Sequence, residues 1–138
     1  MTVLILAELN FQMSARSKAR KRALDAIFQA DLNNKPISTQ EETEEVYEKY
    51  SDVLINGIKE NQTQIDLLIA ESLTNWTIDR IPRVDRNILR IAVYELLFQK
   101  DVPVNVVISE AVKLAEDLST DDSAAFVNGT LANIVKKI

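Results

Sequence analysis

The chain has 138 residues, 46% of them hydrophobic, which is enough for one well-buried core and too little for two ordinary domains. Two glycines and three prolines are too few for the many turns of a β-sandwich or barrel, so a mostly helical chain is expected. The absence of cysteine suits a reducing cytosol, and without histidine the commonest general base and zinc ligand are missing, so we expect no catalytic residue, metal or cofactor.

The first thirteen residues, MTVLILAELNFQM, precede the part of the chain with clear helical patterning. Their apolar run lacks a basic residue before it and is followed by Glu8 and Asn10, which does not fit a signal peptide. No run in the chain approaches the length of a membrane span. We interpret residues 1–13 as an N-terminal extension, either an extra helical turn or a disordered start, and residues 14–138 as one domain.

A basic segment opens this domain. Five of the sixteen lysines and arginines fall within seven residues, namely Arg16, Lys18, Arg20, Lys21 and Arg22. The formal net charge of the chain is −5, so the remaining residues carry about −10. Apolar residues at helical spacing predict a helix from residue 14 or 15 to residue 32, and cations at its N-terminus oppose the helix dipole. These cations form a collar that an anionic partner would stabilise, and single-stranded RNA is the best candidate.

Two more helices are predicted in the N-terminal half. The first spans residues 40–60, and its acidic run at residues 41–45 matches the positive end of the helix dipole. The second spans residues 61–76 and places Ile65 and Trp76 on its apolar face. Together with the basic helix they form a predicted three-helix half.

The middle of the chain is its most apolar part. Apolar residues surround the segment after Pro82 instead of forming one stripe, which predicts a central helix entered at this proline. Arg83, Arg86 and Arg90 lie on one side of that helix. We expect them to make structural pairs with the acidic second helix.

The next segment could be read in two ways. Its β-branched run VNVVI is typical of a strand, but the spacing of Val107, Ala111 and Leu114 favours a helix entered at Pro103. Helix is therefore the prediction for residues 103–118.

The last segment contains a local conflict at Asn128 and Gly129, a pair that normally marks a turn. Apolar residues keep their helical spacing across it, so a helix is predicted to run through the glycine at a cost of about 1 kcal/mol relative to alanine. Such a glycine is useful where another helix or a partner approaches closely. Asp121 and Asp122 precede it and are good N-cap types.

Three motifs in order resemble the NusB family of bacterial transcription antitermination factors. They are the basic start ARSKARKRALDAIFQ, the central VDRNILRIAVYELLFQKDVPVNVVISEAVKLA and the closing DDSAAFVNG. The resemblance covers nearly all of residues 14–138 and leaves the first thirteen outside. It implies an all-α fold of two small helical bundles packed across one another.

The resemblance also implies a function. Members of this family pair with ribosomal small-subunit protein NusE, and the heterodimer binds the single-stranded boxA element of nascent RNA. The complex joins other Nus factors on RNA polymerase and suppresses termination, notably in ribosomal RNA operons. Some members are monomers and others are homodimers that can cover the basic arm, and both states stay open for this chain.

Roles carry over residue by residue. The basic segment matches the family's arginine-rich RNA-binding arm, and Phe28 stands where related proteins often have Tyr, with an aromatic face for a splayed base. Asp85 matches an acidic position linked to RNA or partner binding. Asp122 and Phe126 match the partner and RNA surface of the closing motif.

Two residues depart from the family pattern. Ser109 replaces a common Asn, and Ala124 stands where many relatives have His, which puts fine contacts of that surface in doubt.

Two other classes of protein stay open. One is a protein-interaction scaffold whose basic segment meets an acidic protein. The other is a remnant of the N-terminal domain of an RNA cytosine methyltransferase, although the chain offers neither a cysteine nucleophile nor a glycine-rich cofactor loop.

Overall fold

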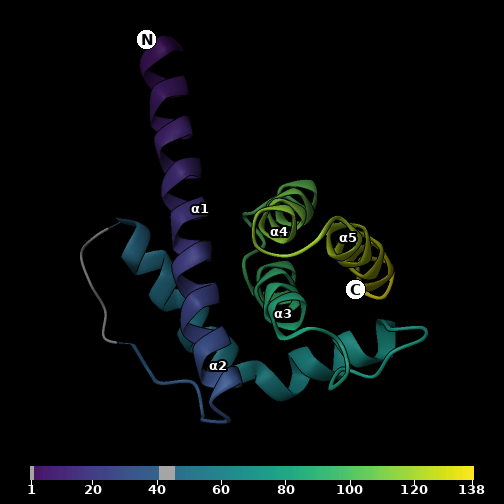
Figure 1. The fold of residues 1–138 in the computed structure, drawn as a ribbon. Coiled ribbons are helices and arrows are strands. Elements are labelled where there is room, and N and C mark those ends of the chain that lie inside the picture. The colour runs from purple at the N-terminus through teal and green to yellow at the C-terminus, as the bar shows by residue number, and fades with distance from the viewer. Residues whose placement is uncertain (1, 41–45) are drawn as a thin grey trace.

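The computed structural model describes the backbone of residues 2–40 and 46–138 and the side chains of residues 15–40 and 49–138. This part of the chain forms five helices and no strand: α1 (Thr2–Leu32), α2 (Val46–Ser72), α3 (Arg83–Phe98), α4 (Val104–Leu118) and α5 (Asp121–Val135). In Figure 1, α3, α4 and α5 are seen nearly end-on as one bundle, while α1 lies beside them with its axis in the plane of the view and α2 passes behind its lower end. The predicted all-α fold of two crossed helical bundles is confirmed.

Helix α1 starts earlier than the apolar spacing predicted. Its backbone is helical from Thr2, so residues 2–13 continue directly into the basic segment. The helix ends where the turn residues NNKP predict. Asn34 adopts the left-handed conformation with φ 53°, and the N–H of Lys35 donates to the carbonyl of Ala30 at 2.9 Å.

Helix α2 covers the two helices predicted for residues 40–60 and 61–76. Asn61 has φ −117° and ψ 18°, which are not helical, and its side-chain amide donates to the carbonyl of Gly57 at 2.8 Å. The predicted boundary is thus a kink within one helix. The acidic run at residues 41–45 lies outside the described residues.

The prediction that this helix reaches Trp76 is wrong. Helix α2 ends at Ser72, and Trp76 is 58% exposed in the loop that follows. The intervening Thr and Asn favour turns over helix, which explains the earlier end. Ile65 and Ile69 are fully buried, so the rest of the apolar face was predicted correctly.

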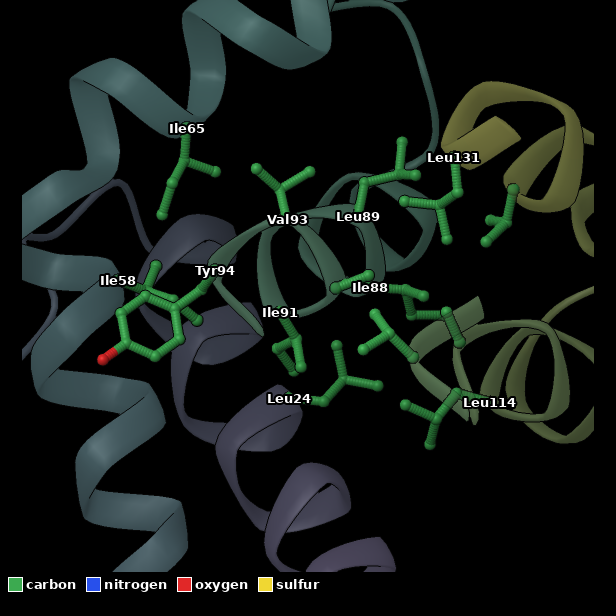
Figure 2. Close-up of a cluster of buried hydrophobic side chains, with 14 of the residues drawn as sticks. Leu24, Ile58, Ile65, Ile88, Leu89, Ile91, Val93, Tyr94, Leu114 and Leu131 are labelled. Atoms are coloured by element: carbon green, nitrogen blue, oxygen red, sulfur yellow. The ribbon is translucent and has the colours of Figure 1, made fainter. Parts of the chain in front are cut away.

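Helix α3 is the centre of the fold, as predicted. It packs against each of the other four helices, and every residue from 87 to 96 is buried. Figure 2 shows Ile91 pointing toward Leu24 of α1 and Val93 pointing toward Ile65 of α2. Burying one such side chain contributes about 1.5–3 kcal/mol. The buried side chains of α3 therefore contribute a large share of the hydrophobic stabilisation of the fold.

The crossing of α2 and α3 depends on Gly57. A Cβ atom at this position would overlap the ring of Tyr94, which lies against the glycine backbone. Glycine therefore allows the two helices to meet here. At Gly129 no other helix approaches closely, because apart from the adjacent backbone of its own helix no described atom lies within 4 Å of the position that its Cβ would take.

Helices α4 and α5 form where they were predicted. Pro103 precedes the first turn of α4, and the VNVVI run is helical. Thr120 caps α5, since its hydroxyl accepts the N–H of Ser123 at 3.1 Å, and the helix continues through Gly129. The predicted helix is therefore favourable enough to offset the intrinsic cost of this glycine.

Ion pairs tie α3 to the two N-terminal helices. Arg86 forms a bidentate pair with Asp31 at the end of α1, with N–O distances of 2.6 and 2.9 Å. Arg90 forms another with Asp66 of α2, at 2.8 Å for both hydrogen bonds. Arg83 is more exposed and lies 3.8 Å from Asp31. The arginines make structural pairs as expected, but the predicted partner helix at residues 40–60 is wrong for these pairs, because the carboxylates come from Asp31 at the end of α1 and Asp66 in the second half of α2.

Two kinds of feature are absent from the described part of the chain. It holds no group of acidic side chains that could bind a metal ion. None of its helices is both long enough and apolar enough to traverse a lipid bilayer.

Candidate nucleic-acid interface

The basic segment lies on α1 beside α4. Lys18, Lys21 and Arg22 are exposed, and the Arg16 side chain is 37% exposed. The hydroxyl of Ser17 donates to the Glu110 carboxylate of α4 at 2.7 Å, which fixes the two helices against each other at this point.

Arg20 is the member of the basic segment that does not reach the surface. It is 3% exposed, and its guanidinium donates to the carboxylate of Glu95 at 2.8 and 2.9 Å. Burial lowers the pKa of Arg20, but the hydrogen bonds and charge of Glu95 outweigh that effect and raise the pKa above its ordinary value. The predicted collar of five exposed cations is wrong at this position, because Arg20 shares the inner side of α1 with Ala23 and Leu24, which are buried.

The two flanking arginines are also paired within the molecule. Arg16 lies 4.6 Å above the centre of the Tyr50 ring and 3.1 Å from the carboxylate of Asp101. Arg22 lies 3.7 Å from Asp52. In the described part of the chain, no carboxylate pairs with either lysine of the basic segment.

Two hollows border Lys21. The first has a volume of about 370 Å³ and is lined by residues that include Lys21, Phe28, Val84 and Leu118. The second has a volume of about 220 Å³ and lies between the basic segment and α4. A half-buried aromatic ring next to an ammonium group can stack a base beside a phosphate contact. The first hollow therefore suits an unpaired nucleotide.

Another hollow brings together Asp85 of the central motif with Asp122 and Phe126 of the closing motif. Its volume is about 390 Å³. Asp85 is 2% exposed, and among the described residues its Oδ1 atom has no hydrogen-bond partner. Asp122 is exposed and Phe126 is half-buried. This combination of carboxylates and an aromatic ring suits a polar partner that buries part of its own surface here.

Sequence reasoning missed two residues of this hollow. Trp76 and Arg80 both line it and are exposed. The helical spacing of Trp76 concealed its position, although a tryptophan that follows Thr and Asn could have been read as a loop residue. Exposed tryptophan and arginine side chains are frequent in binding surfaces.

The hollows at Phe28 and at Phe126 are lined by residues that are close neighbours in the sequence. Val84 lines the first and its neighbour Asp85 lines the second, and Leu118 and Thr120 are divided between them in the same way. The two hollows are therefore lined by adjacent residues at the start of α3 and by residues two positions apart at the turn from α4 to α5.

The two departures from the family pattern lie on a different groove. It has a volume of about 880 Å³, runs between α4 and α5, and includes Ser109 and Ala124 in its lining. Ala124 is 7% exposed, so a larger side chain at this position would extend into the groove or displace a neighbour.

Comparison with known proteins identifies the family. The NusB family model matches residues 17–136. The transcription antitermination protein NusB of Nocardioides sp. is 46% identical over 129 residues, which cover 90% of this chain and 96% of that protein. The corresponding protein of Acidothermus cellulolyticus is 47% identical over 127 residues and 88% of each chain.

Solved structures share the fold. NusB of T. maritima is 37% identical, with a TM-score of 0.74 over 88% of this chain and 91% of that chain. A chain from a crystal structure of antitermination factors NusB and NusE in complex with double-stranded RNA is 28% identical, with a TM-score of 0.79 over 91% of this chain and 99% of that one. With its sequence and its fold both matching over most of its length, this chain belongs to the NusB family of transcription antitermination factors, which are not enzymes.

Proposed function

We propose that this protein binds the single-stranded boxA element of nascent RNA together with the ribosomal small-subunit protein NusE. The observation that carries the proposal is that Lys21, an exposed lysine of the basic segment, borders the hollow at Phe28, while neighbouring residues of α3 line the hollow at Phe126. The solved complex of a related NusB with NusE and RNA supports both kinds of partner.

On the RNA side, Arg16, Lys18, Lys21 and Arg22 contact phosphates, and Phe28 stacks on a base. Phosphate contacts give affinity without sequence preference, whereas an unstacked base in the hollow at Phe28 can be read individually. The solved relative contains double-stranded RNA, whose bases are not available for such stacking. The hollow is the reason to prefer a single strand for this chain.

On the protein side, Asp122 and Phe126 contact NusE, and Asp85 lies between the two partners. The unpaired Oδ1 atom of Asp85 supports this assignment, because a buried carboxylate oxygen without a donor is costly and a bound partner can supply one. Trp76 and Arg80 extend the contact area at the same hollow.

The heterodimer then joins other Nus factors on RNA polymerase in the cytoplasm and suppresses termination, notably in ribosomal RNA operons. Binding at this surface needs no cofactor. Residues 14–138 form the binding domain and residues 1–13 an accessory extension. A homodimer that covers the basic segment would compete with RNA, so the RNA-bound form contains one copy of this chain.

Size-exclusion chromatography with light scattering tests the proposal. The full chain is mixed with NusE and with a boxA oligonucleotide, its duplex form or a scrambled strand. A 1:1:1 complex with the boxA strand, and weaker retention of the duplex and the scrambled strand, is the expected result. Equal binding of all three nucleic acids would contradict boxA recognition. Failure to bind RNA, with nuclease-resistant capture of an acidic protein, would favour the scaffold function.

A further inference from the structure

Arg16 is the surface cation of the basic segment that lies over the Tyr50 ring, while the buried Arg20 lies 5.9 Å from the centre of the same ring. Its guanidinium carbon lies 4.6 Å from the centre of the Tyr50 ring, and its side chain is 37% exposed. A cation above the face of an aromatic ring is attracted by the ring's electron density, and this contact leaves the guanidinium edge to hydrogen bonds. At that edge the Nη2 atom donates to the carboxylate of Asp101 at 3.1 Å, and because the Asp101 side chain is 62% exposed, an RNA phosphate can displace it. Arg16 is thus held at the surface and stays accessible.

The Tyr50 ring is itself held in place by a hydrogen bond to a buried residue. Its hydroxyl donates to the Glu95 carboxylate at 2.6 Å, and Glu95 is 1% exposed. The same carboxylate accepts two hydrogen bonds from Arg20, whose guanidinium also lies 3.5 Å from Glu110 of α4. Burial, and then the negative charge of Glu95, raise the pKa of Tyr50, so its hydroxyl keeps its proton and continues to donate.

These contacts form one chain of support across four helices. It begins at Glu95 in α3, includes Arg20 in α1 with Glu110 in α4, and continues through Tyr50 in α2 to Arg16. A side chain that is already held in place loses less conformational entropy when it binds a ligand.

We propose that Tyr50 is a positioning residue that presents Arg16 to an RNA phosphate. The inference rests on the proposed function, which assigns Arg16 to RNA. It adds a residue outside the three motifs and gives Arg20 a supporting role beneath the surface. The partner of the Tyr50–Arg16 pair is a phosphodiester oxygen, because the guanidinium offers paired N–H donors to such a group once the phosphate has displaced the exposed Asp101 carboxylate.

A series of ring substitutions tests the inference. Phenylalanine at position 50 keeps the ring, whereas fluorinated phenylalanines keep its shape and withdraw electron density from its face. Affinity for a single-stranded boxA oligonucleotide, measured by fluorescence anisotropy, should stay within about twofold for Tyr50→Phe. It should then fall stepwise with added fluorine, by about two- to fivefold in total. The same fluorinated residues at Phe98, which is 41% exposed on α3, are the matched control and should leave affinity unchanged.

A double-mutant cycle tests the dependence on Arg16. Tyr50→Leu should weaken RNA binding in the natural sequence and cause no further loss in an Arg16→Ala background. An undiminished loss in that background, or constant affinity across the fluorinated series, would overturn the inference. If Arg16→Ala leaves RNA affinity unchanged, both this inference and the proposed role of Arg16 are wrong. If Arg16→Ala weakens binding while the fluorinated series is flat, only the role of Tyr50 is wrong.

Discussion

Arg20 and Lys21 are neighbours in sequence with opposite environments. The Arg20 guanidinium is buried against Glu95, whereas Lys21 is exposed between two hollows. The sequence alone does not distinguish the two residues, because each adds one positive charge to the same basic segment. Their physical roles follow from which side of α1 each occupies.

The first prediction separates these roles. Arg20→Ala leaves the buried Glu95 carboxylate without its cation and should lower the free energy of unfolding by about 3–5 kcal/mol. Lys21→Ala should change it by no more than about 0.5 kcal/mol and should weaken RNA binding instead. Urea denaturation and a binding isotherm on each variant check this, with Lys136→Ala on the exposed end of α5 as the control. If Arg20→Ala leaves the free energy of unfolding unchanged, Arg20 has no structural role.

A second prediction concerns pH. Burial raises the pKa of Asp31, but the hydrogen bonds from Arg86 and Asn87 and the charges of Arg86 and Arg90 outweigh it and lower the pKa below its ordinary value. A carboxyl with a lowered folded-state pKa stabilises the fold above its unfolded pKa of about 4, and this contribution is lost as the pH falls through the folded pKa.

The unfolding free energy of the natural protein should therefore fall between pH 5 and pH 3, and Asp31→Asn should show a smaller fall over the same range. Urea denaturation at several pH values measures both. Parallel pH profiles for the two proteins would show that Asp31 contributes nothing to acid sensitivity.

At the scale of helices, apolar spacing predicted helix in all five described elements, but it divided α2 into two helices and started α1 twelve or thirteen residues too late. Pro82 and Pro103 marked two starts, and the helix through Gly129 was correct because packing of its apolar face outweighs one unfavourable residue. The end of α2 was not predictable from spacing, since Trp76 continues the apolar period although the chain has already turned. Periodicity reports which residues could share a face and not whether the helix persists.

The residues of the candidate site were predictable from the sequence only in part. The resemblance assigned Asp85 to RNA binding and Asp122 and Phe126 to partner binding from two separate motifs, whereas the structure places all three around one hollow. The pairing of Arg20 with Glu95 joins residues far apart in the chain, and no local pattern indicates such a contact. Whether a cation of the basic segment is exposed was therefore beyond what the sequence could establish.

A third prediction compares the two glycines. Gly129→Ala should stabilise the protein by about 1 kcal/mol, because alanine favours the helix and its methyl group meets no described atom. Gly57→Ala should destabilise it, since the methyl group would overlap the Tyr94 ring. Thermal melts of the two variants check the opposite signs. If Gly129→Ala is stable but no longer binds NusE, the glycine is needed because the partner packs closely against the helix at this position.

At the scale of the whole molecule, charge is distributed unevenly. The basic segment concentrates five cations, and the remaining residues carry about −10. Most of the surface therefore repels nucleic acid and directs it toward the exposed cations of α1, beside the hollow at Phe28.

The fourth prediction concerns the extension. Deleting residues 1–12 shortens α1 at its N-terminal end, outside the family match at residues 17–136. The truncated protein should keep its fold and nearly all of its RNA affinity. Circular dichroism and a binding isotherm measure these properties. A loss of helicity larger than the removed residues account for would show that the extension contributes to the folded domain.

The salt dependence of RNA affinity tests the central claim most directly, namely that the exposed cations of α1 neutralise phosphates of a single strand. Three or four such contacts predict a slope of about −2 to −3 in a plot of log affinity against log salt, because each contributes about −0.7. Replacing Lys18 and Lys21 by alanine should flatten the slope by about 1.4, while Phe28→Ala should weaken binding with the slope unchanged, since stacking releases no counterions. An unaltered slope in the double lysine variant would contradict the account, because it would place the RNA phosphates elsewhere on the molecule.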